Sequence, residues 1–210
     1  MADWFRRKTW TERDELEFFA KLSRARKDGR AQYLKIQAIE LIETKEKGLL
    51  QVAESLLNKV LTEYPDDSFN KSSSLHNLGE IYKLNDDFDM ALMYYKHALD
   101  FENIYPQVRT QAYLDYCELV VKTDKKDLFN DAERILEMEI NSQPFPIVKY
   151  KLYSLLSIIN MSKGNSLVAK QYADLAEQNA TAETSGLRYH KYLGIVKERD
   201  NWLERLMRGK

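Results

Sequence analysis

The sequence predicts an all-α fold in which helical hairpins follow one another along the chain. The composition supports helices, because only four Pro and seven Gly occur in 210 residues and helix-forming residues are abundant. Residues 75–98 place apolar and small side chains at helical spacing on two segments that a polar turn separates. Segments 47–57 and 126–136, KGLLQVAESLL and KDLFNDAERIL, are similar and indicate an internal repeat.

Residues 75–98 predict one hairpin in detail. Gly79 in the first helix and Ala91 in the second are small where two helix backbones must come close, and Tyr82 and Tyr95 fill the space beside them. The turn at residues 85–87 separates the helices. The pattern Leu75-x-x-Leu78-Gly79-x-x-Tyr82 followed by Ala91-x-x-x-Tyr95-x-x-Ala98 resembles the tetratricopeptide repeat (TPR).

The resemblance implies a right-handed α-solenoid of about four TPR-like hairpins within residues 31–183. The expected hairpins are 31–65, 72–103, 110–144 and 150–181. Pro65 and Pro144 follow the two similar segments at equal distances, where Pro ends the second helix of a hairpin.

The two ends are expected to cap this array, and all parts are expected to form one domain. Residues 1–30 predict an N-terminal segment and a capping helix that begins at Thr11, with Asp14 completing a capping box and a break at residues 28–29. Residues 184–210 predict one C-terminal capping helix. As an alternative to packing, Trp4, Phe5 and Trp10 are a possible secondary docking patch. The opening DWFRRKTW resembles that of a group of bacterial TPR proteins, a resemblance that implies no activity.

Charge and cysteine content limit the classes of partner. The net charge of −1 gives no overall field for nucleic acid or for an anionic membrane. Cys117 is the only cysteine, which excludes an intrachain disulfide and favours an intracellular protein. The N-terminus has no apolar core of a secretory signal and no apolar run is long enough for a bilayer, so we expect a cytoplasmic location.

The sequence predicts no catalytic, metal or cofactor site. His76, His97 and His190 lie on different segments, without a second His or Cys at the spacing of zinc ligands. A calcium loop beginning at residue 85 fails, because Met90 replaces the required Gly and Lys96 the required Glu. Phosphate-binding glycine loops and nucleophile-elbow motifs are also absent from the sequence. We therefore expect a protein that is not an enzyme.

The TPR resemblance implies that the first helices of successive hairpins line a concave groove for peptides or partner helices. By aligned position, the groove residues are Gln32, Lys35, Ile39, Ser73, His76, Asn77, Glu80, Lys83, Gln111, Asp115, Glu118, Lys122, Lys151 and Ser154. A clamp for the C-terminal carboxylates of heat-shock chaperones, known in part of the family, is not expected. Asp115 replaces a basic clamp residue and would repel such a carboxylate.

The expected function is a non-enzymatic protein-protein interaction module, an adaptor or scaffold that binds a peptide or a partner protein through its concave face. The alternative is an immunity or antitoxin-like protein that sequesters a cognate toxin. A small-molecule binder or an enzyme is a weaker alternative. The expected partner is a protein or peptide rather than nucleic acid or membrane, and a second copy of the chain bound through the terminal helices is a further candidate.

Overall fold

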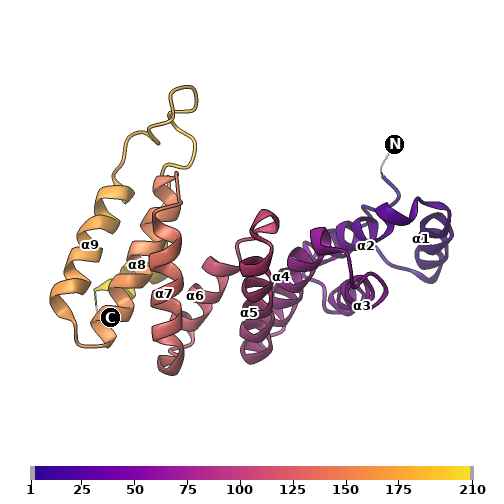
Figure 1. Ribbon diagram of the computed structural model, residues 1–210, viewed down its shortest axis with the longest axis horizontal. Coiled ribbons are helices and arrows are strands. Elements are labelled where there is room, and N and C mark those ends of the chain that lie inside the picture. Colours follow the sequence, from indigo (N-terminus) through magenta and orange to yellow (C-terminus); the bar gives the residue numbers. More distant parts are fainter. Residues whose placement is uncertain (1–2, 209–210) are drawn as a thin grey trace. The chain divides into compact units, whose positions relative to one another are not determined.

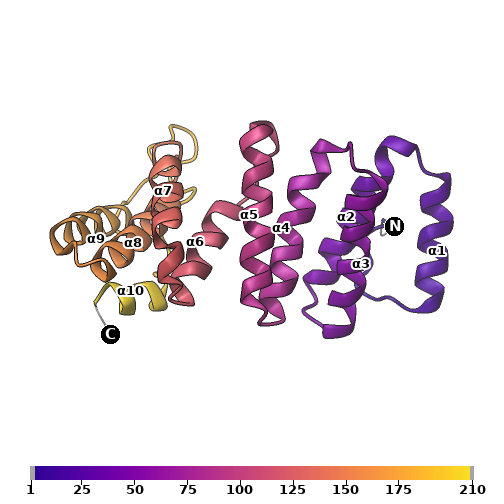
Figure 2. The ribbon, with the colours of Figure 1, turned by 60° about the horizontal axis from the view of Figure 1, so that its bottom comes forward.

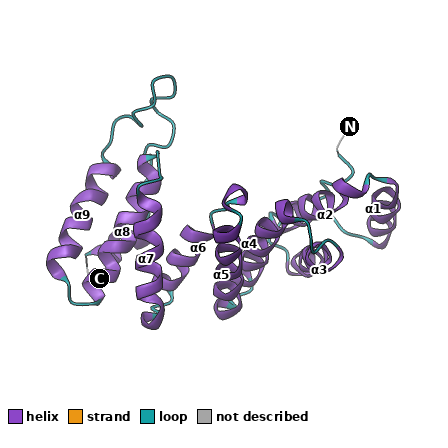
Figure 3. Ribbon diagram, in the orientation of Figure 1, coloured by secondary structure: helices purple, strands orange, loops and turns teal. Residues whose placement is uncertain are grey.

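The computed structural model describes residues 3–208, and within that range the chain forms helices, turns and loops without a β-strand (Figure 3). The α-helices are α1 (Glu12–Arg24), α2 (Lys27–Ile42), α3 (Lys47–Glu63), α4 (Ser68–Leu84), α5 (Phe88–Ile104), α6 (Ala112–Lys122), α7 (Phe129–Ile140), α8 (Pro146–Ser162), α9 (Ser166–Ala180) and α10 (Asn201–Met207) (Figure 1). The predicted all-α class is confirmed. No helix in the described range has the length and apolar sequence that crossing a bilayer requires.

The chain divides into two compact units, residues 1–112 and residues 113–210. The first unit contains α1 to α5, and the second contains nearly all of α6 together with α7 to α10. Residues 1–2 and 209–210, which the predicted terminal segments include, lie outside the described range. The expectation that all parts form one domain stays a prediction.

Adjacent helices pair as hairpins in both units. In the first unit α2 packs against α3 and α4 against α5, and in the second unit α8 packs against α9 (Figure 2). Helices α6 and α7 meet through side chains, because the Cys117 thiol lies 3.6 Å from the carbonyl oxygen of Ala132. The hydroxyl of Tyr116 donates to Asp131 at 3.1 Å across the same pair. The sequential pairing predicted from the hairpin pattern is therefore confirmed.

The turns inside the four hairpins share a backbone feature. Each contains one residue with positive φ: Lys45 after α2, Asp86 after α4, Asp124 after α6 and Gly164 after α8. Such a residue ends a helix by pointing its amide back toward the last turn. The four hairpins therefore share the position of one backbone feature, and the internal repeat stays a prediction.

The central hairpin packs as its small residues predict. A Cβ atom on Gly79 of α4 would lie 2.5 Å from the ring of Tyr95 on α5, so only glycine fits there. Tyr95 itself is completely buried, and so is Ala91. The expectation that Gly79 is small because the paired helix comes close is confirmed.

The two units are built around different helices. In the first unit, leucine and alanine side chains of α2 and α3 form one buried cluster with Phe18, Leu78 and Ile81. In the second unit α8 is the central helix, and an unbroken run of residues 154–160 is buried. Ala169 and Ala176 of α9 are fully covered where they meet it. Their small side chains allow the close approach expected for this hairpin.

The start of the chain follows the predicted cap, with one correction. Thr11 and Asp14 form the expected capping box at the start of α1. The expected break at residues 28–29 is wrong, because the helices are separated at residues 25–26 and residues 28–29 belong to the first turn of α2. An acidic residue such as Asp28 is favourable in a first helical turn, where Gly29 does not interrupt many hydrogen bonds.

The C-terminal segment differs most from its prediction. Instead of one helix over residues 184–210, residues 181–200 contain no helix, and among the residues described after them only Asn201–Met207 is helical. Gly186 and Gly194 adopt positive φ of 78° and 73°. A Cβ atom on Gly194 would also lie 2.4 Å from the ring of Phe145. These glycines end the apolar pattern that suggested a continuous helix, because a chain bend is more favourable there than a helical turn.

Candidate functional site

The first unit places two first helices of hairpins side by side. Helix α2 contacts α4 directly. Each of the two also contacts the second helix of its own hairpin, α3 or α5. We name their shared outer surface the α2–α4 face; it is formed by the predicted residues Gln32, Lys35, Ile39, Ser73, His76, Asn77, Glu80 and Lys83. Gln32 is exposed and the other seven are half-buried, so the face is accessible while its side chains are partly enclosed.

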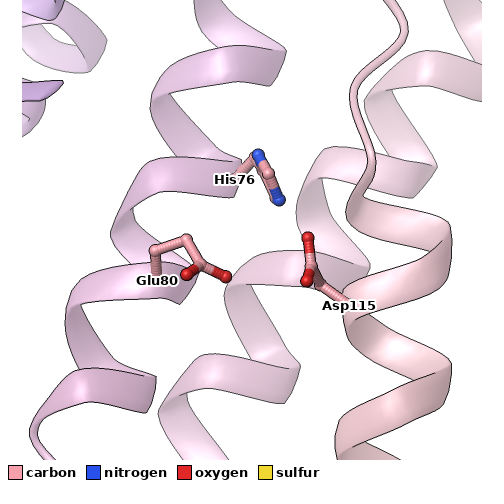
Figure 4. Close-up of side chains that lie close together, drawn as sticks. All are labelled: His76, Glu80 and Asp115. Carbon is pink, nitrogen blue, oxygen red and sulfur yellow. The ribbon is translucent and has the colours of Figure 1, made fainter. Parts of the chain in front are cut away.

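Glu80 is the most firmly held side chain of the α2–α4 face. Its carboxylate accepts a hydrogen bond from the hydroxyl of Tyr95 on α5 and one from Lys83 Nζ at 2.5 Å. The ring of His76, one turn earlier on α4, lies 5.6 Å from the Tyr95 ring, centroid to centroid. Figure 4 shows His76 and Glu80 projecting from the same side of α4; Asp115, also labelled there, is a residue of α6 in the second unit. The face therefore offers a preset acceptor and an imidazole in adjacent turns.

Lys35 is half-buried, and its ammonium group lies near an aromatic ring. Burial lowers the pKa of its ammonium group, and the negative charge of Asp67 only partly opposes this effect. The ammonium lies 5.7 Å from the centre of the Phe69 ring, which is 67% exposed. Partial desolvation strengthens the interaction of such a cation with a further anion or aromatic ring.

Beside Lys35 the surface is hollowed into an open cavity of about 680 Å³. Its lining includes Arg30 and Gln32 of α2 and Phe69 and Asn70 of α4. Asn70 is 3% exposed and its Nδ2 donates to Asp67 at 2.8 Å, but among the described residues its Oδ1 has no hydrogen-bond partner. The prediction from aligned helices missed Asn70, since an isolated Asn near a helix start is usually a local cap.

The predicted residues of the later hairpins are placed in several ways. Gln111 is exposed just before α6, and Asp115 is half-buried on α6. Ser154 is fully buried and its hydroxyl donates to the carbonyl oxygen of Tyr150 at 2.7 Å. The expectation that Ser154 offers a partner-binding surface is corrected by this burial. It lies on the side of α8 that faces the core of the second unit.

Glu118, Lys122 and Lys151 come together in the second unit as one charged network. Lys151 Nζ of α8 lies 3.1 Å from Glu118 of α6, and Lys122 Nζ lies 3.3 Å from the other oxygen of the same carboxylate. Burial lowers the pKa of Lys151, but the charge of Glu118 and of Asp200 outweighs this effect and the net pKa is raised. We name the surface around these three residues and Tyr150 the α6–α8 face.

The α6–α8 face is covered by the chain's own last helix, α10, which packs on α8 (Figure 2). Asp200 lies 3.3 Å from Lys151 Nζ, and Lys122 Nζ lies 4.3 Å from the centre of the Trp202 ring. Glu204 accepts a hydrogen bond of 3.0 Å from the Tyr150 hydroxyl; burial first, and then this carboxylate, raise the pKa of Tyr150. Tyr150, Asp200 and Glu204 were not predicted.

The aromatic residues at the start of the chain are half-buried in the first unit. The Trp4 ring lies 5.3 Å from the ring of Phe18 and 5.0 Å from that of Tyr33, and Trp10 also lies 5.3 Å from Phe18. Phe5 contacts the Tyr33 ring at 4.8 Å. This packing favours the capping role of Trp4, Phe5 and Trp10 over a docking patch.

Comparisons of the chain with protein-family models, with curated proteins and with solved structures found no match.

Proposed function

We propose that the protein is a non-enzymatic interaction module of the TPR type that binds a peptide or a partner protein through the α2–α4 face. In this proposal the hairpins form a right-handed α-solenoid, and the first helices carry the binding residues. The repeated hairpins, their common turn and the contact between α2 and α4 support it.

The observation that carries the proposal is the state of the polar side chains on the α2–α4 face. Glu80 is fixed by Tyr95 and Lys83, and Asn77 is fixed by a 2.6 Å hydrogen bond to the carbonyl oxygen of Ser73. Side chains that are already ordered lose little entropy when a partner binds, which favours affinity. The same residues remain half-exposed, so a partner can reach them.

The cavity beside Lys35 suggests the form of the partner. An extended segment or helix that lies along the α2–α4 face can insert one side chain over Phe69, where an exposed ring offers apolar contact. Lys35 adds a partly desolvated ammonium group beside Phe69, which favours a partner segment with a carboxylate.

The test is affinity capture from the native cell at low salt, with mass spectrometry, using two matched charge-reversal variants. Lys35→Glu/Lys83→Glu changes the α2–α4 face, whereas Lys59→Glu/Lys96→Glu makes the same change on the second helices α3 and α5. We expect one stoichiometric partner that the wild type and the second variant retain and the first variant loses. The loss should follow from repulsion of the partner's carboxylates.

Equal capture by both variants, with circular dichroism showing both folded, would contradict the α2–α4 face as the binding site. A toxin as the captured partner would assign the immunity-like function instead of the adaptor function.

A further inference from the structure

The last helix of the second unit, α10, is short and packs on α8. Helix α10 follows residues 181–200, a connection without helix that extends beyond the ends of α8 and α9 (Figure 1). Within α10, Leu203 is the only buried residue, while Trp202 and Glu204 are half-buried. Connections of this length without secondary structure are uncommon in compact domains and are often functional.

The helical state of α10 depends on the surface below it. Seven residues are too few to form a stable helix in water, because the cost of the first turn is recovered only over about 12 residues or more. Packing of Leu203 and the polar contacts to Tyr150 and Lys151 therefore hold α10 in its helical form. The α6–α8 face is, in this sense, a surface that binds a short helix.

The chemistry of that surface is complementary to a helix that presents an apolar anchor between two carboxylates. The face presents two ammonium groups, Lys122 and Lys151, and the donor hydroxyl of Tyr150. Its own carboxylate, Glu118, is already paired with both lysines. Opposite these donors lie Asp200, directly before α10, and Glu204 within it, one on each side of the Trp-Leu pair. Opposite charges on the two sides set the orientation of the helix.

The connection allows α10 to leave without disturbing the core of the unit. Gly194 accepts a hydrogen bond of 2.8 Å from the amide of Ile147, which fixes the middle of the connection at the start of α8. Between this point and α10, Arg199 forms two hydrogen bonds of 2.7 Å to Glu177 on α9. This bidentate pair fixes Arg199 on α9, so only the residues after it have to move when α10 leaves its face.

We propose that α10 is a displaceable internal ligand, and that the α6–α8 face binds in its place a helix of a partner protein that carries two carboxylates at the spacing of Asp200 and Glu204. The partner helix presents an apolar anchor at the place of Leu203, flanked by carboxylates that pair with Lys151 and with the hydroxyl of Tyr150. The inference goes beyond the proposed function, since it concerns the second unit and a surface that is closed until α10 leaves. Because α10 is tethered, its effective concentration at the face is high. It therefore lowers the apparent affinity of the face for any external helix by competition.

The test uses a fluorescein-labelled synthetic peptide with the sequence of residues 198–208 and full-length protein variants, with binding measured by fluorescence anisotropy. Leu203→Asp removes the anchor of α10 and should open the face, so the peptide should bind this variant about tenfold or more tightly than the wild type. The matched control is Leu206→Asp, the same change at a residue that is 37% exposed. It should leave α10 in place and peptide binding weak.

Two further variants locate the peptide on the face. Lys151→Glu added to Leu203→Asp should abolish the gain, because it reverses the charge that Asp200 of the peptide meets. A peptide that carries the Leu203→Asp change should not bind any of the proteins. Folding of each variant is verified by its circular dichroism and unfolding midpoint.

A folded Leu203→Asp protein that binds no more peptide than the Leu206→Asp control would overturn the proposal. If Leu203→Asp does not fold, the wild-type protein decides instead. Excess unlabelled peptide with Trp replaced by Phe should release Trp202 from Lys122 and shift its emission to longer wavelength. An unchanged emission spectrum at millimolar peptide would show that α10 is a fixed part of the unit. If the wild-type protein is a dimer and the peptide dissociates it, the face binds α10 of a second copy. That result would overturn the proposal of a partner protein.

Discussion

The first and last helices of the chain, α1 and α10, differ in how each is attached to its own unit. Helix α1 brings two buried side chains, Phe18 and Leu22, into the core of the first unit. The segment before it is fixed twice by Gln37, whose Oε1 accepts from the Arg7 amide at 3.0 Å and whose Nε2 donates to the Arg7 carbonyl at 2.7 Å. Arg7 also pairs with Asp14 at 2.5 Å and with Glu17 at 2.8 Å.

Helix α10 has a single buried side chain, Leu203, and its other contacts are made by half-buried polar or aromatic groups. It follows a connection that exposes Tyr189 and Tyr192 by 80% and 72%. Both helices were expected to cap the array, and in both cases a terminal helix covers part of its unit. The comparison teaches that covering a surface does not make a helix part of the core: the number of buried anchors decides whether the helix can leave.

The largest expected change in unfolding free energy comes from replacing the buried side chains of the terminal helices by alanine. Phe18→Ala should destabilise the first unit by about 3–5 kcal/mol, because a completely buried ring is replaced by a cavity. In α10 a second substitution should not lower the unfolding free energy further, because the helix already detaches when Leu203 is shortened. Leu203→Ala and Leu203→Ala/Trp202→Ala should therefore have equal unfolding free energies in urea, whereas Leu22→Ala added to Phe18→Ala should cost more.

If the second substitution in α10 lowered the unfolding free energy as much as the second one in α1, the distinction between the two helices would be lost. Far-ultraviolet circular dichroism with linear extrapolation supplies the free energies.

A smaller effect is expected at Gln37, which is fully buried. Gln37→Met keeps the side-chain length but leaves the amide and carbonyl of Arg7 without their partner. The expected destabilisation is about 1–3 kcal/mol, the usual cost of unpaired buried polar groups. Thermal unfolding of the variant beside Gln32→Met, the same change at an exposed position, measures it. Equal melting temperatures would mean that the segment before α1 contributes no stability.

The smallest effect is a dependence on acid pH. Hydrogen bonds from the Thr11 amide and hydroxyl, and then from Arg7, lower the pKa of Asp14 from 3.8 to about 2. A lowered pKa in the folded state means that the ionised carboxylate stabilises the fold above about pH 4. This contribution should disappear as the pH falls from about 4 to 2. Asp14→Asn should remove that part of the pH dependence, as unfolding midpoints between pH 6 and pH 2 would reveal; parallel profiles would disprove the role of Asp14.

The hairpins could be predicted because their causes are local in the sequence. Gly79 and Tyr95 are brought together by helical spacing and one short turn, and Thr11 and Asp14 form their capping box within one turn. The C-terminal segment could not be predicted in the same way. Apolar residues at helical spacing favoured one helix. In the structure the chain turns at Gly194, whose backbone lies close to the ring of Phe145, and tertiary packing alone determines that contact.

The candidate surfaces follow the same division. Lys35, His76 and Glu80 could be assigned to one face because they lie on the first helices of adjacent hairpins. The contact of Lys151 with Asp200 depends on the path of residues 181–200, and no periodic pattern encodes that path. Asp200 interrupts the apolar spacing of the segment, and that interruption is the one sequence signal for the start of a separate helix.

The most direct test of the account is native-state hydrogen exchange of the wild-type protein, followed by mass spectrometry or NMR. Amides of α1 should exchange with the same opening free energy as those of α2, because they open only when the first unit unfolds. Amides of α10 should exchange through a much smaller opening free energy than those of α8, because α10 leaves its face while the second unit stays folded. Equal opening free energies for α10 and α8 would contradict the account and make α10 a fixed part of the fold.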